Sequence, residues 1–295
     1  MKTITMKNYQ TDESRASSAG FLSRDESRET RAKQLLPSTL NPQPSTLSQL
    51  RAFTIVELLV VIAIIGILAA LLLPVLAAAK RHAQVKQAQV EISQIVGAIQ
   101  QYDSVYGRFP VSANDQALAG TGDFTCGGAA YDVSGINQLW IMGITNNAEV
   151  IAILMDATNY PGGGPTPNMN YVKNPQRTIF LNAKIVNDTN SPGVGPDGVY
   201  RDPWGGPYII TMDLNYDEQC RDSNYCQRVV SQNPPLSSSQ AGFNGLFNPD
   251  PIASNPDNFL YHGKVMVWSA GPDRKIDILE SANDRENRDN ILSWQ

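Results

Sequence analysis

The chain has little of what enzymes and metal centres are built from. Only two of its 295 residues are histidines, His82 and His262, and only three are cysteines. No Cys-x-x-Cys pair is present, which argues against a zinc site or a thioredoxin-like redox site. No Gly-x-Ser-x-Gly turn accompanies His262, and no glycine-rich loop precedes a helix to cradle phosphate. We therefore expect a protein that is not an enzyme, with His262 in a turn or on the surface.

Basic residues are scarce beyond residue 52. Eight of the 23 Lys and Arg precede Phe53, together with five acids, so the rest of the chain holds 15 basic and 23 acidic residues, a net charge of −8. Binding to nucleic acid needs Lys and Arg that replace phosphate counterions. This balance argues against nucleic acid as a partner and is compatible with divalent cations.

Charge is absent from Leu58 to Ala79, where every residue is apolar or small and Pro74 is the single interruption. As a helix this run spans about 33 Å, enough to cross the hydrocarbon core of a bilayer, and it is longer than a secretory h-region. We predict a membrane helix that Pro74 bends or loosens locally. The positive-inside rule does not orient it, because basic residues flank both ends: Lys33 and Arg51 on one side, Lys80, Arg81 and Lys86 on the other.

The helical pattern continues beyond the apolar run and becomes amphipathic over residues 80–110. Apolar side chains recur at spacings of three and four, at Ile92, Ile95, Ile99, Tyr102 and Tyr106. Gly107 and Pro110 then end the pattern. Two separate helices are the alternative. Because no turn signal divides the run, we predict one helix of about 50 residues.

The rest of the chain predicts a small α+β head. Residues 1–52 mix charges with Ser, Thr and Pro and have no apolar periodicity, so we expect them to be disordered. Residues 111–295 are rich in loops, between which we predict a short helix at Ala148–Met155, a helix or strand at Thr178–Val186, and strands at Tyr208–Met212 and Lys264–Trp268. The fold class is a long N-terminal helix packed on a small antiparallel β-sheet with loop insertions.

The start of the apolar run reads Arg51-Ala52-Phe53-Thr54-Ile55-Val56-Glu57-Leu58-Leu59. It resembles the processing site of type IV pilins and type II secretion pseudopilins: a small residue, Phe, a few apolar residues, then Glu. The resemblance implies a pilin-like fold, cleavage by prepilin peptidase after Ala52 and N-methylation of Phe53. The family usually has Gly where this chain has Ala52. The implied parts are a cleaved leader (1–52), a membrane and filament-core helix (53–79), the amphipathic half of that helix (80–110) and an exported head (111–295).

Glu57 is a functional candidate on physical grounds. A carboxylate inside a membrane helix costs about 2.5–3.5 kcal/mol on insertion scales, so such residues usually have a role. The alternative is that Glu57 lies at the interface without one. The resemblance supplies a partner: the terminal amine of Phe53 on a neighbouring subunit, which would set the axial register between subunits.

Three further stretches resemble the major, G-type pseudopilin of type II secretion. They are Gly107-Arg108-Phe109-Pro110 at the helix exit, Asp202-Pro203-Trp204-Gly205-Gly206-Pro207-Tyr208 before a strand, and a C-terminal loop with Ser269-Ala270-Gly271-Pro272-Asp273 and Asp289-Asn290-Ile291-Leu292-Ser293-Trp294. Each motif alone could be an ordinary β-turn, so their order and placement carry the resemblance. Residues 111–200 show none of it.

The resemblance implies a structural subunit of a periplasmic pseudopilus. Such a protein crosses the inner membrane once, holds its head in the periplasm, and is extracted into a helical filament of its own copies and other pseudopilins by an inner-membrane assembly platform. Two alternatives stay open. One is a type IV pilin of a surface filament for adhesion, motility or DNA uptake, and the other is a membrane-anchored binding module whose residues 111–200 recognise a ligand.

Two smaller predictions concern the head. In the G-type family the C-terminal loop binds Ca²⁺, and the candidates here are Asp273, Asp277, Asp284 and Asp289; the alternative is a solvated acidic loop. Cys220 and Cys226 enclose a short polar loop, and in an exported head we expect them to form a disulfide. The alternative is three unpaired thiols, Cys126 included.

Overall fold

The computed structural model describes residues 53–120, 122–128, 145–233, 241–250 and 256–295. The predicted leader, including Ala52, lies outside the described residues, as does part of the 111–200 stretch. The chain divides into two compact units, Met1–Ile55 and Val56–Gln295. The second unit contains the head and all of α1 except its first residue.

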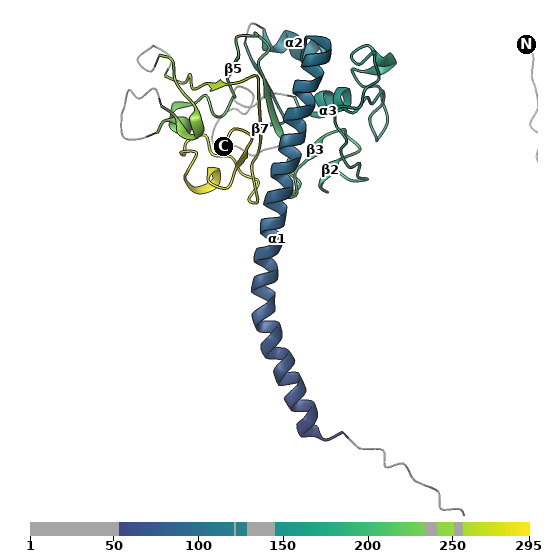
Figure 1. Ribbon diagram of the computed structural model, residues 1–295, viewed down its shortest axis with the longest axis vertical. Coiled ribbons are helices and arrows are strands. Elements are labelled where there is room, and N and C mark those ends of the chain that lie inside the picture. The colour runs from purple at the N-terminus through teal and green to yellow at the C-terminus, as the bar shows by residue number, and fades with distance from the viewer. Residues whose placement is uncertain (1–52, 121, 129–144, 234–240, 251–255) are drawn as a thin grey trace, which may run out of the picture. The chain divides into compact units, whose positions relative to one another are not determined.

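One helix, α1, runs from Ile55 to Tyr106 over 52 residues with Pro74 inside it (Figure 1). The prediction of one helix in place of two is therefore confirmed. Gly107 ends it in the left-handed region, with φ of +62°, and its N–H donates to the carbonyl of Asp103 at 2.7 Å. Glycine adopts this conformation without the steric cost that a Cβ would add.

The head packs on the second half of α1. In Figure 1 the sheet and the smaller elements lie around this half, and the first half extends away from them. The side chains that α1 buries include four of the predicted stripe, Ile92, Ile95, Ile99 and Tyr102, together with Ala88 and Ala98. Tyr106 is partly buried against the same core. The pilin-like α+β fold is thus confirmed.

The sheet has four antiparallel strands in the order β1-β4-β7-β8. Its central strands β4 (Ile209–Met212) and β7 (Val265–Ser269) lie within one residue of their predicted ranges, and β1 (Phe124–Cys126) and β8 (Ile291–Leu292) add the edges. Because side chains alternate along a strand, the sheet serves two cores. Ile210 and Val267 pack with α1, whereas Ile209 and Trp268 pack in a second cluster beyond the sheet.

Short elements complete the head. They are the helices α2 (Ala113–Ala119), α3 (Ala148–Leu154) and α4 (Arg228–Ser231), the pairs β2 (Gly193–Val194) with β3 (Tyr200–Arg201) and β5 (Gln219–Cys220) with β6 (Tyr261–His262), and the 3-10 turns η3 (Met169–Tyr171), η4 (Phe243–Gly245) and η5 (Arg285–Asn287). The helix predicted at 148–155 is confirmed as α3. Residues 178–186 form neither a regular helix nor a strand: Phe180 and Leu181 both donate to the carbonyl of Leu154, and Ile185 makes a single bridge to Val194.

Polar contacts tie α1 to the head along its length. Tyr208, fully buried at the start of β4, donates its hydroxyl to Glu91 Oε2 at 2.5 Å. Nearer the membrane half, Gln84 Nε2 donates to the carbonyl of Pro203 at 3.2 Å. Near the other end, Tyr102 donates to the carbonyl of Lys173 at 2.6 Å. A buried polar group must keep its partner, so these bonds fix where the head sits along the helix.

The predicted disulfide is absent from the structure, and all three cysteines are free and buried. Cys220 packs in the cluster beyond the sheet. The thiol of Cys226 instead faces the carbonyl of Ser223 at 3.5 Å. Burial raises the pKa of each thiol, which lowers its reactivity as a thiolate. The thiols therefore behave as small apolar side chains in this fold.

The buried stripe on α1 predicts that substitutions at two positions of this helix change the stability of the head by very different amounts. Ile95 is fully buried, whereas Val90 on the same helix is 57% exposed. Ile95→Ala should lower the free energy of unfolding of the head by about 2–5 kcal/mol, because it leaves a cavity under the sheet. Val90→Ala should lower it by less than about 0.5 kcal/mol. Urea unfolding of the full chain in detergent, followed by tryptophan fluorescence, measures both; equal effects would contradict this packing.

Candidate processing and assembly site

The motif residues lie at the beginning of α1. Phe53 is 69% exposed and precedes the helix, which starts at Ile55. Glu57 lies in the first helical turn, where the positive end of the helix dipole favours a carboxylate. Ala52, the predicted cleavage position, falls outside the described residues. The described part of the motif is thus an accessible segment that leads directly into a helix.

The first half of α1 has no protein cover in the part of the chain that the structure describes. Every residue from Phe53 to Ala83 is exposed, and the large apolar side chains of α1 up to Leu76 are 44–83% exposed. Among the described residues, α1 is the one helix long and apolar enough to cross a membrane. Its length and composition therefore support the predicted membrane helix.

The sequence motifs of the head, which are far apart in the chain, meet in space. Asp202 is buried and accepts hydrogen bonds from the backbone N–H groups of Trp204 and Gly206 at 2.9 Å, and from Ser269 Oγ at 2.6 Å. Ser269 Oγ in turn accepts from the N–H of Gly271. The turn at 202–208 and the stretch 269–273 are therefore held together through one carboxyl group. Burial raises the pKa of Asp202 to about 6.

The C-terminal motif contacts β7, the strand that ends at Ser269. Ser293 N–H donates to the carbonyl of Val267, and Ser293 Oγ accepts from the N–H of Val267 at 3.0 Å. Gly271 lies close to the backbone of Asp289, and a Cβ at Gly271 would come within 2.3 Å of the Asp289 carbonyl. Because its φ is +69°, this position also favours glycine conformationally.

The four aspartates predicted to bind Ca²⁺ do not come together. Oδ1 of Asp273 accepts from the N–H of Lys275, and Oδ1 of Asp277 from the N–H of Leu279. Asp284 precedes η5 as its N-cap. Burial and the charge of Asp273 raise the pKa of Asp289, so these two are near each other. Within the described ranges no group of three or more His, Cys, Asp or Glu is placed to hold a metal ion, so these four side chains do not form one ligand group. Binding of Ca²⁺ to this loop stays a prediction.

A buried carboxyl pair, absent from the sequence analysis, joins α2 to α3. Asp115 is 1% exposed, and its two oxygens accept no bond from the donors of the described chain. The carboxyl group of Glu149, in the first turn of α3, acts on it electrostatically. Two neighbouring carboxylates repel each other when both are charged, which favours a proton on Asp115. Burial first, and then Glu149, raise the pKa of Asp115 to about 7.

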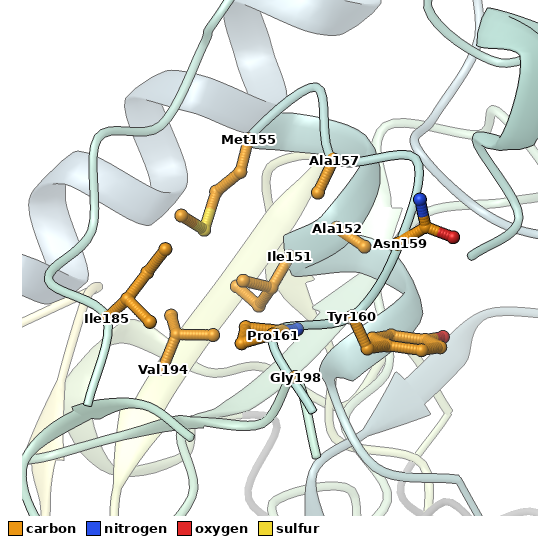
Figure 2. A pocket seen from close by; sticks show the side chains of 10 residues that line it. All are labelled: Ile151, Ala152, Met155, Ala157, Asn159, Tyr160, Pro161, Ile185, Val194 and Gly198. Carbon is orange, nitrogen blue, oxygen red and sulfur yellow. The ribbon is translucent and has the colours of Figure 1, made fainter. Parts of the chain in front are cut away.

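An apolar pocket of about 120 Å³ lies beside α3 (Figure 2). Figure 2 shows Ile151 of α3 and Met155, which directly follows α3, facing Ile185 and Val194 across it. Tyr160 lies along the edge, and a Cβ at Gly198 would come within 2.4 Å of its ring. Most of the lining side chains are apolar, so the pocket suits an apolar group.

The two histidines lie at the surface. His82 is exposed on α1 just beyond the apolar run. His262 is exposed as well and stacks its ring on Phe247, with centroids 3.9 Å apart and planes at 8°. These positions agree with the expected surface placement of His262.

The family model of the prokaryotic N-terminal methylation motif matches residues 48–73 of the chain. The matched segment contains Ala52, Phe53 and Glu57 as well as most of the apolar run. It indicates a type IV pilin-like prepilin protein, a class of structural subunits that are processed by prepilin peptidase and assemble into pilus-like filaments. No curated protein and no solved structure gave a significant match to the chain.

The Asp115–Glu149 pair makes stability depend on pH. The folded chain keeps on Asp115 a proton that the unfolded chain releases above its ordinary pKa of 3.8, so stability should fall as pH rises from about 4 to about 7 and then level off. Asp123 and Asp202 also have raised pKa values and add slopes of the same sign. Asp115→Asn should therefore flatten the slope without abolishing it.

Urea midpoints of the full chain in detergent, measured between about pH 4 and pH 8, test this expectation. Asp250→Asn, at an exposed acid, is the control and should reproduce the wild-type slope. A slope in Asp115→Asn as steep as that of the wild type would show that Asp115 does not keep its proton in the folded chain.

Proposed function

We propose that the chain is a structural subunit of a periplasmic pseudopilus that drives protein export by type II secretion. The observation that carries the proposal is α1: one half lies under the head, and the other half is an uncovered apolar helix that begins at a prepilin motif. In the membrane, lipid covers that half. In a filament, the same half of neighbouring copies covers it.

Filament growth requires contacts between unlike surfaces. A head-to-tail contact that does not close generates an open helical assembly. The first half of α1 supplies the cohesive surface, and the head supplies lateral contacts. We assign to Glu57 the role of setting the axial register through the methylated amine of Phe53 on a neighbouring copy. A charge pair in so apolar a setting is costly to break, which makes a wrong register unfavourable.

The arrangement of the head supports the pseudopilin over the surface pilin. The turn at 202–208, the stretch 269–273 and the C-terminal motif resemble the G-type subunit, as residues 107–110 do, and these three converge on β7 and its end. A resemblance spread over unrelated turns would not produce one connected set of contacts. Residues 111–200 add to this frame α3, the β2–β3 pair and the apolar pocket.

The proposal predicts a separation between membrane insertion and assembly. Glu57→Gln should leave the protein processed and inserted in the inner membrane, because removing a charge lowers the cost of insertion. Its recovery in the filament fraction and the secretion of exported proteins should both fall at least tenfold. Glu218→Gln, at an exposed acid of the head, is the matched control and should behave as the wild type.

The two readouts distinguish the alternatives. Loss of surface filaments with normal secretion would assign the chain to a surface pilus. Normal incorporation of Glu57→Gln into filaments would overturn the register role of Glu57. A wild-type protein that stays in the membrane and never enters a filament would overturn the pseudopilus and leave an anchored binding module.

A further inference from the structure

The charges on α1 are segregated. Between Glu57 and Glu91 the chain has no acidic residue, and the three charged residues in this interval are Lys80, Arg81 and Lys86. From Glu91 to the C-terminus there are 12 basic and 22 acidic residues, a net charge of −10. A short positive segment thus separates an uncharged membrane helix from an acidic head.

The three basic side chains surround the helix. Successive residues of an α-helix are about 100° apart, so Lys80, Arg81 and Lys86 project in three directions separated by roughly 100–140°. All three are exposed, and none belongs to the ion pairs formed among the described residues. Lys86 Nζ donates to Gln89 Oε1 at 3.1 Å, an exposed bond that water or phosphate can replace.

Their height along α1 coincides with the headgroup layer of a bilayer. Lys80 and Arg81 directly follow Ala79, the last residue of the apolar run, and Lys86 lies about 10 Å further along the axis. The headgroup region is roughly 5–7 Å thick on each side of the hydrocarbon core, and the long side chain of Lys86 can reach down into it.

The head leaves this level open. Residues 80–83 are exposed, and Gln84, about 7.5 Å beyond Ala79, donates a hydrogen bond to the carbonyl of Pro203 in the head. The half-buried Trp204 follows in that turn, and tryptophan is enriched at membrane interfaces. A neighbouring loop approaches this turn, with the carbonyl of Asn190 close to Gly205. The acid in that loop is Asp188, whose carboxylate oxygens accept hydrogen bonds from Asn190 and Ser191.

We propose that Lys80, Arg81 and Lys86 form a basic collar that binds the phosphate groups of anionic phospholipids in the leaflet on the head's side of the membrane. The collar is continuous with the lipid-facing surface of α1, and its charge is complementary to the headgroups at its height. The inference rests on the membrane residence contained in the proposed function. It does not depend on which side of the membrane the head occupies.

The collar has a consequence for assembly. Extraction of a subunit from the bilayer must break its phosphate contacts together with its apolar ones. Each basic residue near an anionic surface changes the affinity on the order of fivefold at moderate salt. The anionic lipid content of the membrane therefore sets part of the barrier between the membrane pool and the filament.

The test is lipid selection by the full chain. The protein is reconstituted in nanodiscs of phosphatidylcholine with a minor fraction of phosphatidylglycerol, and the lipids it retains on release are counted by native mass spectrometry. The wild type should retain phosphatidylglycerol at least about threefold above its share, and this excess should fall as ionic strength rises. The triple variant Lys80→Gln, Arg81→Gln, Lys86→Gln should retain the two lipids in proportion to their supply.

A matched variant controls for the loss of three charges. Its three positions lie near the other end of α1. Lys264 pairs with Asp103, Arg108 follows the helix end, and Arg177 donates its N–H to Asn174, which accepts from Tyr106. Changing these three to Gln should leave the lipid preference intact.

The outcomes are distinct. Equal retention of both lipids by an inserted wild type, or a preference that salt does not reduce, would overturn the collar and leave the pseudopilus proposal standing. Equal loss of preference in both triple variants would also overturn it. Release of the wild type from the membrane by alkaline carbonate would overturn the collar together with the membrane residence on which it rests.

Discussion

The uncovered half of α1 is the constraint on which the rest of the structure depends. Sixteen large apolar side chains between Ile55 and Leu76 are exposed. Burying each is worth about 1.5–3 kcal/mol, so their exposure to water would cost roughly 25–50 kcal/mol, several times the 5–15 kcal/mol that holds a domain folded. The chain therefore needs a second environment for this surface. Lipid and a bundle of identical helices both provide one, and the described head covers none of it.

The head is built so that this helix can change its surroundings without unfolding. It packs on the other half of α1 through a buried stripe that begins at Ala88, beyond the end of the apolar run, and hydrogen bonds at Gln84, Glu91 and Tyr102 fix it along the axis. β7 serves both cores of the head, one shared with α1 and one beyond the sheet. Because these contacts leave the first half of α1 untouched, the same head fits a subunit in the membrane and in a filament.

The sequence predicted the parts of the fold that have strong local signals. The long helix, its buried stripe, its Gly107 end and the two central strands follow from periodicity and turn residues. Edge strands β1 and β8 are only two or three residues long, too short for a period to show. The Asp115–Glu149 pair joins residues 34 positions apart, and the disulfide and the calcium site depend on distances between side chains that spacing does not determine. The processing motif is local and was found directly.

The most direct test of the central claim is the mature N-terminus. The chain is expressed with a prepilin peptidase, and the terminal peptide of the membrane-bound product is sequenced by mass spectrometry. A prepilin must begin at N-methylated Phe53, with the uncovered half of α1 at its extreme end. An intact leader, or cleavage at another position, would contradict the account, because the amine that Glu57 is proposed to bind would then not exist.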